Sequence, residues 1–168
     1  MLLICTKPSQ INFGQLMRVY SQSNRQSGAM RYPDLSDERQ LYEAEQDYYL
    51  FLREFYTVPD AVYLIWTSDG IYKSALRLEP YRDGLLIEGL ETAPEYRKMG
   101  YAKKLLSEAV SYISATQHLI LYSHIAKNNF VSQNVHMACG FREILDYAVY
   151  IDGSVDRNSS TFKKECNP

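Results

Sequence analysis

The chain has 168 residues, of which 46% are apolar and 23% are charged, and its formal net charge is -2 at pH 7. This length predicts a single domain over residues 1–168 with a sizeable hydrophobic core. The near balance of acidic and basic residues argues against a nucleic-acid-binding protein, because such proteins usually carry a marked basic excess. No apolar run approaches the roughly 20 residues needed to cross a membrane, and the apolar stretch at residues 1–5 is too short for the core of a signal peptide.

The sequence contains three cysteines, which are odd in number and far apart: Cys5, Cys139 and Cys166. They form no ligand-spaced cluster with the three histidines, so the sequence predicts neither a disulfide framework nor a metal site. We therefore expect a reduced, cytoplasmic protein that binds no metal ion, no membrane and no nucleic acid.

The first 60 residues predict one strand followed by two helices. Residues 2–6 form a short apolar stretch that suits a strand. Ser9 is expected to cap a first helix, and residues 23–33 are polar and predict a loop. A long amphipathic helix then starts at Asp34 or Ser36, with its apolar positions three and four residues apart.

After Asp60 the pattern changes to strands separated by turns. Residues 61–67, 71–79 and 85–92 alternate in polarity or are rich in β-branched and aromatic side chains, and we expect them to form an antiparallel meander. The remaining predicted elements are a helix over 100–114, a strand over 118–124, a helix over 130–139 that Gly140 ends, a strand over 141–151 and a last strand over 159–163.

The predicted order of elements is β-α-α-β-β-β-α-β-α-β-β. A strand–helix–strand–helix core that follows a meander implies an α/β fold, with a mixed central sheet covered by helices. We expect about six or seven strands, flanked by four helices.

The junction between the third meander strand and the next helix carries the clearest chemical pattern, Thr92–Leu106. Gly100 and Ala102 are small, so a ligand can approach the main chain closely there. The free N–H groups of the first helical turn would converge on an anion such as a pyrophosphate. Four basic residues surround this point: Arg97, Lys98, Lys103 and Lys104. An ordinary loop-to-helix junction with solvated lysines has the same features, so that alternative stays open.

Two other phosphate-binding patterns do not fit this junction. A dinucleotide-binding turn needs three glycines in a GxGxxG pattern and an acidic residue at the end of the next strand. Here one glycine stands in the turn, and the next predicted strand ends at Ser123 and His124. A P-loop needs Gly-Lys followed by Ser or Thr, a motif that the sequence lacks.

A second segment, Asn128–Phe141, follows a buried strand as a short helix that ends in Gly-Phe. Together the two segments resemble the GNAT superfamily of acetyl-CoA-dependent N-acetyltransferases. In the first segment, three residues fill the family signature Arg/Gln-x-x-Gly-x-Gly/Ala: Arg97, Gly100 and Ala102. In the second, five residues match the family stretch Asn-x-x-Ala/Ser-x-x-Leu-Tyr-x-x-x-Gly-Phe: Asn129, Ser132, Val135, Gly140 and Phe141. His136 stands where the family usually has tyrosine.

The resemblance implies a GNAT-like fold and the transfer of an acetyl group from acetyl-CoA, with coenzyme A as product. The acceptor would be a primary amine of a small molecule or a protein. A homodimer is possible, but the sequence does not determine the oligomeric state. A contrasting hypothesis is a non-catalytic module of the same fold that binds acyl-CoA as a sensor or regulator.

The resemblance also implies which residues bind the cosubstrate. Two parallel strands would part to admit the pantetheine arm, and one strand would bond it through main-chain groups of three residues: Leu90, Glu91 and Thr92. The pyrophosphate would be held by the turn and helix start: Arg97, Lys98, Met99, Gly100, Tyr101 and Ala102. Asn129 and Ser132 would lie on the other side of the arm, although Asn129 is also placed to cap the second helix.

Two residues are candidates for moving protons. His136 is placed by its motif position to protonate the leaving thiolate, with a structural polar residue as the alternative. Glu88 is the candidate that deprotonates the amine, acting directly or through water, with an ordinary surface glutamate as the alternative. Glu88 and Glu91 would point to opposite faces in a regular strand, and a bulge would alter that.

Three tyrosines of the long helix recur every seven residues: Tyr42, Tyr49 and Tyr56. With Glu38 and Glu45 they could form an acidic, aromatic surface for a cationic amine. The same spacing is typical of a packing face, and this second interpretation is the favoured one.

Overall fold

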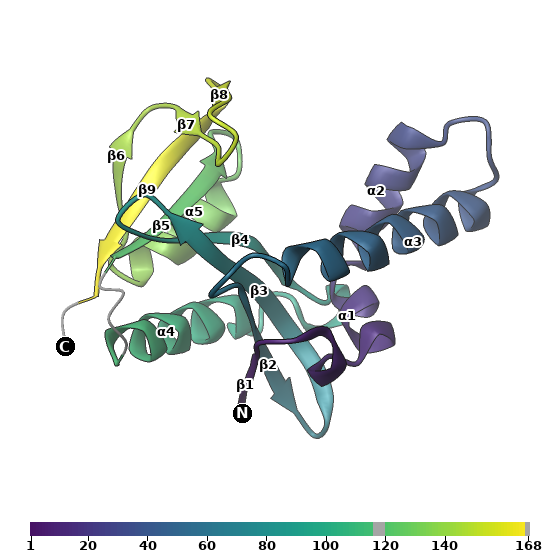
Figure 1. Cartoon of the computed structure of the whole chain (residues 1–168), viewed down its shortest axis with the longest axis horizontal. Helices are drawn as coiled ribbons and strands as arrows, with labels where there is room; N and C mark the ends of the chain where they lie inside the picture. Colours follow the sequence, from purple (N-terminus) through teal and green to yellow (C-terminus); the bar gives the residue numbers. More distant parts are fainter. Residues whose placement is uncertain (116–119, 167–168) are drawn as a thin grey trace.

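The computed structural model describes residues 1–115 and 120–166 (Figure 1). Its strands are β1 (Leu2–Cys5), β2 (Val62–Ser68), β3 (Ile71–Tyr81), β4 (Gly84–Thr92), β5 (Ile120–Ala126), β6 (Arg142–Leu145), β7 (Ala148–Val149), β8 (Val155–Asp156) and β9 (Ser159–Glu165). The helices are α1 (Phe13–Val19), α2 (Ser21–Arg31), α3 (Asp37–Phe55), α4 (Tyr101–Ser114) and α5 (Phe130–Ala138), with single 3-10 turns at η1 (Pro8–Gln10) and η2 (Pro94–Tyr96).

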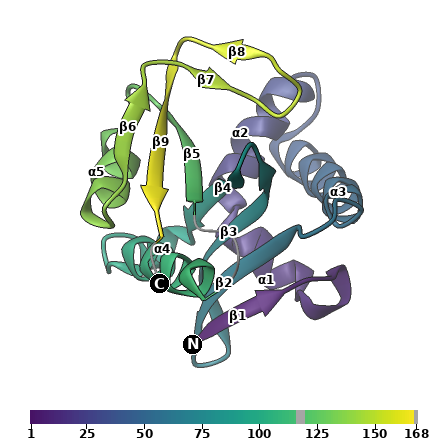
Figure 2. The same ribbon diagram turned by 60° about the vertical axis from the view of Figure 1, so that its left-hand side comes forward.

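Seven strands form one mixed sheet in the order β1-β2-β3-β4-β5-β9-β6. The first four are antiparallel neighbours, which confirms the predicted meander. β5 then pairs parallel to β4 after the α4 crossover, and β9 pairs antiparallel to β5. Figure 2 shows β5, β9 and β6 on the side of α5, with the β7–β8 pair crossing above them. This arrangement confirms the expected α/β fold with a mixed sheet.

The two faces of the sheet bury separate groups of apolar side chains, because neighbouring residues of a strand point to opposite faces. Leu64 and Leu76 pack with Leu105 and Leu106 of α4 on one face. On the other face Tyr63, Ile65 and Ala75 pack with residues of the first and third helices: Leu16, Leu52 and Phe55. The sheet is therefore the middle layer, with α1 to α3 on one side and α4 on the other (Figure 1).

The predicted loop over residues 23–33 is wrong, because most of this segment belongs to α2. Asn24 and Gly28 are the residues that α2 buries, and neither is apolar enough to produce a helical hydrophobic pattern. Gly28 lets α2 approach α3 closely, since a Cβ built on it would lie 2.4 Å from the carbonyl oxygen of Gln40. The described chain thus has five α-helices where four were expected.

Two further boundaries differ from the prediction. Ser9 lies in η1, and the first helix is capped instead by Asn12, whose side chain accepts a hydrogen bond from the Gln15 N–H at 3.1 Å. The strand expected over 141–151 ends at Leu145 and is followed by the short β7. The start of the strand expected over 118–124 lies outside the described residues, within which β5 begins at Ile120.

None of the helices in the described part of the chain is long and apolar enough to cross a membrane. Within the same residues, no group of three or more histidine, cysteine or acidic side chains is placed to hold a metal ion.

The close approach of α2 and α3 yields a stability prediction. Gly28→Ala should lower the free energy of unfolding by about 1–3 kcal/mol, because the added Cβ collides with backbone that cannot move independently. Gly14→Ala in α1 is the matched control, since its Cβ would come no closer than 3.6 Å to the Asn12 side chain. Urea denaturation of both variants checks this, and a Gly28→Ala protein as stable as the Gly14→Ala protein would contradict it.

Candidate active site

The parallel strands β4 and β5 separate partway along their length. Their register runs from Leu85 opposite Leu121 to Ile87 opposite Ser123 and then ends. β4 nevertheless continues to Thr92 and β5 to Ala126. An opening between two parallel strands is the feature that the family resemblance implied for the pantetheine arm.

A bulge in β4 lies where this strand leaves β5. Arg77 of β3 pairs with Glu88, whereas Ala75 pairs with Glu91, so β4 has one more residue than β3 over this stretch. Gly89 takes the left-handed conformation there, with φ 57°. A bulge of this kind turns the side chains that follow it.

The bulge brings Glu91 to the face that Glu88 already occupies, the one covered by α1, α2 and α3. Glu88 Oε2 lies 3.3 Å from Nε of Arg77, whose guanidinium packs on the ring of Phe51 in α3. The Glu91 carboxylate is hydrogen-bonded by Ser23 of α2, and burial raises the pKa of Glu91. Opposite orientations of Glu88 and Glu91, expected for a regular strand, are therefore not found.

Open space lies at the N-terminus of α4. Gly100 is the N-cap, in the left-handed conformation with φ 81°. The first helical hydrogen bond runs from the Lys104 N–H to the Gly100 carbonyl at 3.0 Å, so the N–H groups of the first turn point out of the helix. A Cβ built on Gly100 would meet no heavy atom within 4 Å. The residues present therefore fit an anion such as the pyrophosphate of coenzyme A.

The side chains of the predicted turn surround this space. Arg97 donates from Nε to the Thr92 carbonyl at 3.2 Å, and its guanidinium also donates to the Gln22 side chain of α2. Arg97 thus ties the turn to α2. The other residues of the turn are exposed or half-buried: Lys98, Met99, Tyr101 and Ala102. Leu90, on the strand before it, packs partly buried against the core under α4.

The α5 segment begins with a capped turn. Asn129 Oδ1 accepts a hydrogen bond from the Ser132 N–H at 3.1 Å, so the capping alternative for Asn129 is realised. Asn129 is exposed and Ser132 is half-buried. Gly140 ends the helix region with φ 84°, the left-handed conformation expected for it.

His136 is buried, with 1% of its surface exposed. Its Nδ1 lies 2.8 Å from the Ser132 carbonyl oxygen, and its ring packs edge-on against Phe141. A ring nitrogen this close to a carbonyl must carry the proton, so Nε2 of the neutral ring bears the lone pair. Nε2 is enclosed and has no hydrogen-bond partner among the described residues. Burial lowers the pKa of His136, which favours the neutral ring.

Glu79 of β3 places a second carboxyl group beside Glu88, and this residue was not predicted from the sequence. Burial raises the pKa of Glu79 to about 7, with a further contribution from its hydrogen bond to Glu88 and the charge of Glu88. Arg77 opposes this shift. Alternation along β3 puts Arg77 and Glu79 on one face, and Glu88 shares this face because it pairs directly opposite Arg77.

His124 of β5 was also missed. Its ring packs edge-on between the rings of Tyr81 and Tyr150, each 5.3 Å away between centroids. Both ring nitrogens are enclosed and have no hydrogen-bond partner within the described ranges 1–115 and 120–166. Burial lowers the pKa of His124, while Glu88 opposes the shift. In the sequence, the feature that marks His124 is its position at the end of a buried strand, where a dinucleotide-binding site would need an acidic residue.

The tyrosines of α3 do not form the packing face favoured by their spacing. Tyr42 and Tyr49 are 49% and 45% exposed. The Tyr56 hydroxyl donates to the Cys5 carbonyl at 2.9 Å, which anchors the end of α3 to β1. Tyr48, one of the positions on the predicted apolar face of this helix, stacks on Tyr20.

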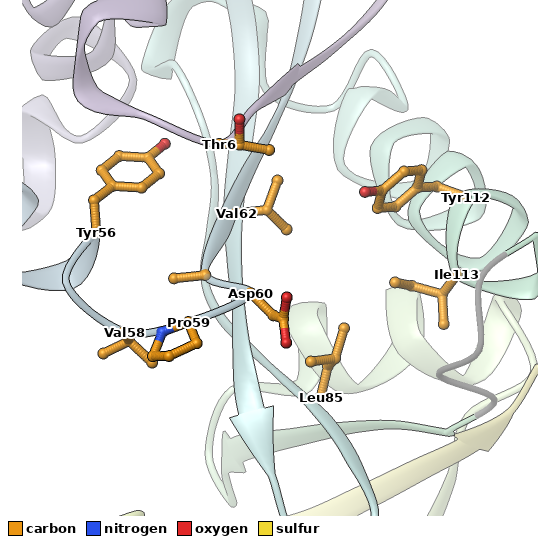
Figure 3. A pocket seen from close by; sticks show the side chains of 10 residues that line it. Thr6, Tyr56, Val58, Pro59, Asp60, Val62, Leu85, Tyr112 and Ile113 are labelled. Atoms are coloured by element: carbon orange, nitrogen blue, oxygen red, sulfur yellow. The ribbon is translucent and has the colours of Figure 1, made fainter.

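A cavity of about 480 Å³ lies away from the opening (Figure 3). Tyr112 and Ile113 of α4 line one side of it, and Tyr56 and Asp60 lie on the other. Leu85 contributes from the start of β4, the end opposite to the bulge. This cavity therefore does not belong to the site between β4 and β5.

Comparison with solved structures finds the same fold in several acetyltransferases. The PaiA N-acetyltransferase of Thermoplasma acidophilum in complex with coenzyme A matches with a TM-score of 0.66 and 17% identity, over 98% of this chain and 99% of that one. The ribosomal-protein alanine N-acetyltransferase of Escherichia coli matches with a TM-score of 0.63 and 13% identity, over 100% and 96%. An aminoglycoside 6'-acetyltransferase of type Ii matches with a TM-score of 0.66 and 12% identity, over 100% and 98%.

At these low identities, the structural matches show a shared fold. No curated protein matches the sequence closely enough to count as a relative. The model of the acetyltransferase (GNAT) family, however, matches residues 29–141, well over half of the chain. The matched region contains β4, the Gly100 turn, β5 and α5, which are the elements that build the opening. The chain therefore belongs to the acetyltransferase (GNAT) family, whose enzymes use acetyl-CoA.

Proposed function

We propose that the protein is an N-acetyltransferase that transfers the acetyl group of acetyl-CoA to a primary amine by direct attack of the amine nitrogen on the thioester. The observation that carries this proposal is the opening between β4 and β5. It has a pair of carboxyl groups on one face of the sheet and a helix N-terminus with open space at its edge. Acetyl-CoA supplies an acyl carbon that is activated toward attack by an amine.

The main chain does most of the proposed binding. The N–H groups of the first turn of α4 would receive the pyrophosphate, and Lys98 adds positive charge nearby. Leu90, Glu91 and Thr92 would offer main-chain groups at the edge of β4 that β5 has left. Asn129 and Ser132 would lie at the opposite side, at the start of α5.

The carboxyl pair is proposed to remove the first proton from the acceptor. An alkyl amine has a pKa of ~10 and is mostly an ammonium ion at neutral pH, which has no lone pair for attack. Glu88 would take that proton, directly or through water, and share it with Glu79, whose raised pKa of about 7 suits a base near neutral pH. Arg77 keeps the pair charge-balanced through its contact with Glu88.

His136 is proposed to carry the second proton. After attack, the nitrogen is positively charged and still holds a proton that it must lose. The lone pair on Nε2 would accept this proton as the N–H bond breaks, and would pass it to the sulfur as the carbon–sulfur bond breaks and its electron pair moves to sulfur. The imidazole thus ends neutral, as it began. The Nδ1 contact to the Ser132 carbonyl supports this order of events, because it places the lone pair on Nε2, the enclosed nitrogen that the reacting groups would have to reach.

Acceptors of two classes agree with the proposal. Two structural neighbours are named for their acceptors, a ribosomal-protein alanine and an aminoglycoside. We propose that the acceptor here is likewise an amine of a small molecule or a protein.

Binding of the cosubstrate can be tested without knowing the acceptor. Coenzyme A should raise the melting temperature of the protein, because a ligand that binds the folded state stabilises it. Gly100→Val should remove this rise, because the side chain would occupy the open space at the α4 N-terminus. Gly70→Val is the matched control. Gly70 also has a positive φ, 72°, and open surroundings, but it lies in the β2–β3 turn.

In thermal-shift measurements, both variants should lose similar stability, and only Gly70→Val should keep the response to coenzyme A. A wild-type protein with no response would contradict the proposed function. A protein that binds coenzyme A but releases none of it from acetyl-CoA, with a panel of primary amines, would instead be a non-catalytic binding module.

The carboxyl pair predicts a pH dependence. The rate of amine acetylation at low amine concentration should rise as pH increases through about 7, when Glu79 loses its proton. In Glu79→Gln the rise in kcat/KM should occur at lower pH. Glu88→Gln should have a low kcat/KM both below and above pH 7. The measurement is kcat/KM against pH for the three proteins, and identical profiles would contradict the role of the pair.

Stability provides a control that needs no acceptor. The pKa of Glu79 in the folded protein, about 7, exceeds the ordinary 4.5, so the unfolded chain releases this proton first. The free energy of unfolding of the wild type should therefore decrease as pH rises from 4.5 to about 7. Glu79→Gln should reduce that decrease in urea denaturation.

Replacement of His136 tests the proposed proton transfer. His136→Phe keeps an aromatic ring beside Phe141, and should lower kcat roughly 100-fold, or about 3 kcal/mol of barrier, with little change in acetyl-CoA affinity. His136→Tyr should recover much of the activity. Because the ring starts and ends neutral, the wild-type rate should show no fall at alkaline pH. Unchanged kcat in His136→Phe would mean that the residue is structural.

A further inference from the structure

His124 borders the opening from the side of β5. Ile87 and Ser123 are the last paired residues of the two parallel strands, and Glu88 and His124 are the residues that follow them. Both lie on the face of the sheet that carries Arg77, and the charge of Glu88 acts on the His124 ring. A group that enters the opening from this face therefore passes between Glu88 and His124.

The His124 ring lacks the hydrogen bonds that an enclosed imidazole requires. A neutral imidazole has one N–H donor and one acceptor nitrogen. Neither ring nitrogen is exposed, and neither has a partner in the described part of the chain. An enclosed polar group without a partner is destabilising, and a ligand that reached the ring and supplied a partner would remove this cost.

The surroundings of His124 suit an amine. The charged groups that act on it come from three elements: Glu88 of β4, Arg82 of the β3–β4 turn and Asp156 of β8. Two acidic groups therefore face it for each basic one. The rings of Tyr81 and Tyr150 each pack edge-on against the imidazole. Aromatic rings beside acidic groups are a favourable environment for an alkylammonium ion.

We propose that His124 contacts the acceptor directly, by accepting a hydrogen bond from an N–H of the amine whose proton Glu88 removes. This inference rests on the proposed function and adds a residue of β5 to it. The neutral form of the ring is the one that can accept this bond, and burial favours that form. Tyr81 and Tyr150 act as positioning residues, because they fix the plane of the ring.

A bisubstrate analogue tests the contact without knowledge of the natural acceptor. In this compound the sulfur of coenzyme A is joined through CH2–C(O) to the nitrogen of n-butylamine, so coenzyme A binding carries an N–H group into the opening. The wild type should bind the analogue more tightly than coenzyme A. In His124→Phe, which keeps the ring contacts but has no nitrogen, this preference should fall by about tenfold, or 1.4 kcal/mol.

Ile125→Val is the matched control, because Ile125 is the next residue of β5 and faces the core under α4. It should keep the full preference for the analogue. A second readout uses the wild-type protein and so does not depend on the folding of a variant. In ¹⁵N NMR of the histidine rings, the His124 nitrogens should shift with the analogue and stay in place with coenzyme A alone.

The outcomes separate the two proposals. Failure of the wild type to bind coenzyme A would overturn the proposed function and this inference with it. If coenzyme A binds, an unchanged preference in His124→Phe together with unmoved His124 nitrogens would show that the residue only packs between tyrosines, and would overturn this inference alone. Loss of the preference together with a shift of the nitrogens supports the contact.

Discussion

The site depends on the separation of β4 from β5 beyond Ile87 and Ser123. β5 stays paired with β9 along its whole length, to Ala126 opposite Ser159. Beyond Ser123, the main chain of β5 is therefore paired on the side of β9 and unpaired on the side of β4. β4 is turned away by the bulge at Gly89, whose carbonyl accepts a hydrogen bond from the Tyr20 hydroxyl at 2.7 Å. The first helices and the last strand, at opposite ends of the sequence, therefore jointly maintain the opening.

On the face of the sheet next to α1–α3, charged side chains lie together in largely apolar surroundings. Glu79 and Glu88 lie together there, and Arg77 is the cation that balances them, with its guanidinium on the Phe51 ring. Burial strengthens every interaction in such a cluster and makes one of the two acids hold its proton up to near neutral pH. Burial also lowers the pKa of His124 and of His136, each in its own surroundings. The neutral ring that this favours can accept a proton or a hydrogen bond.

The coenzyme A recognition proposed for the α4 N-terminus differs in kind, because it would rely on main-chain groups. A helix N-terminus and a left-handed Gly100 provide N–H groups whatever the neighbouring side chains are. The fold is shared with a coenzyme A complex at 17% identity. In the proposed mechanism, the side chains that meet the acceptor are specific to this chain and include His124 and His136.

The amino-acid sequence alone determined the features that depend on local periodicity and backbone chemistry. The meander, the α4 and α5 helices, the helix end at Gly140 and the N-cap at Asn129 follow from patterns within a few residues. α2 was not predicted from the sequence, because its buried residues, Asn24 and Gly28, do not form a pattern of apolar side chains at helical spacing.

Tertiary structure decided the rest, because the deciding contacts join distant segments. The place of β9 between β5 and β6 depends on pairing across the sheet. Burial and the contact with Glu88 on another strand raised the pKa of Glu79, and the bulge decided that Glu91 shares a face with Glu88. The Ser132 carbonyl and burial set the tautomer of His136, and two tyrosines remote in sequence enclosed His124. Such effects arise from burial and through-space contact, which no local pattern records.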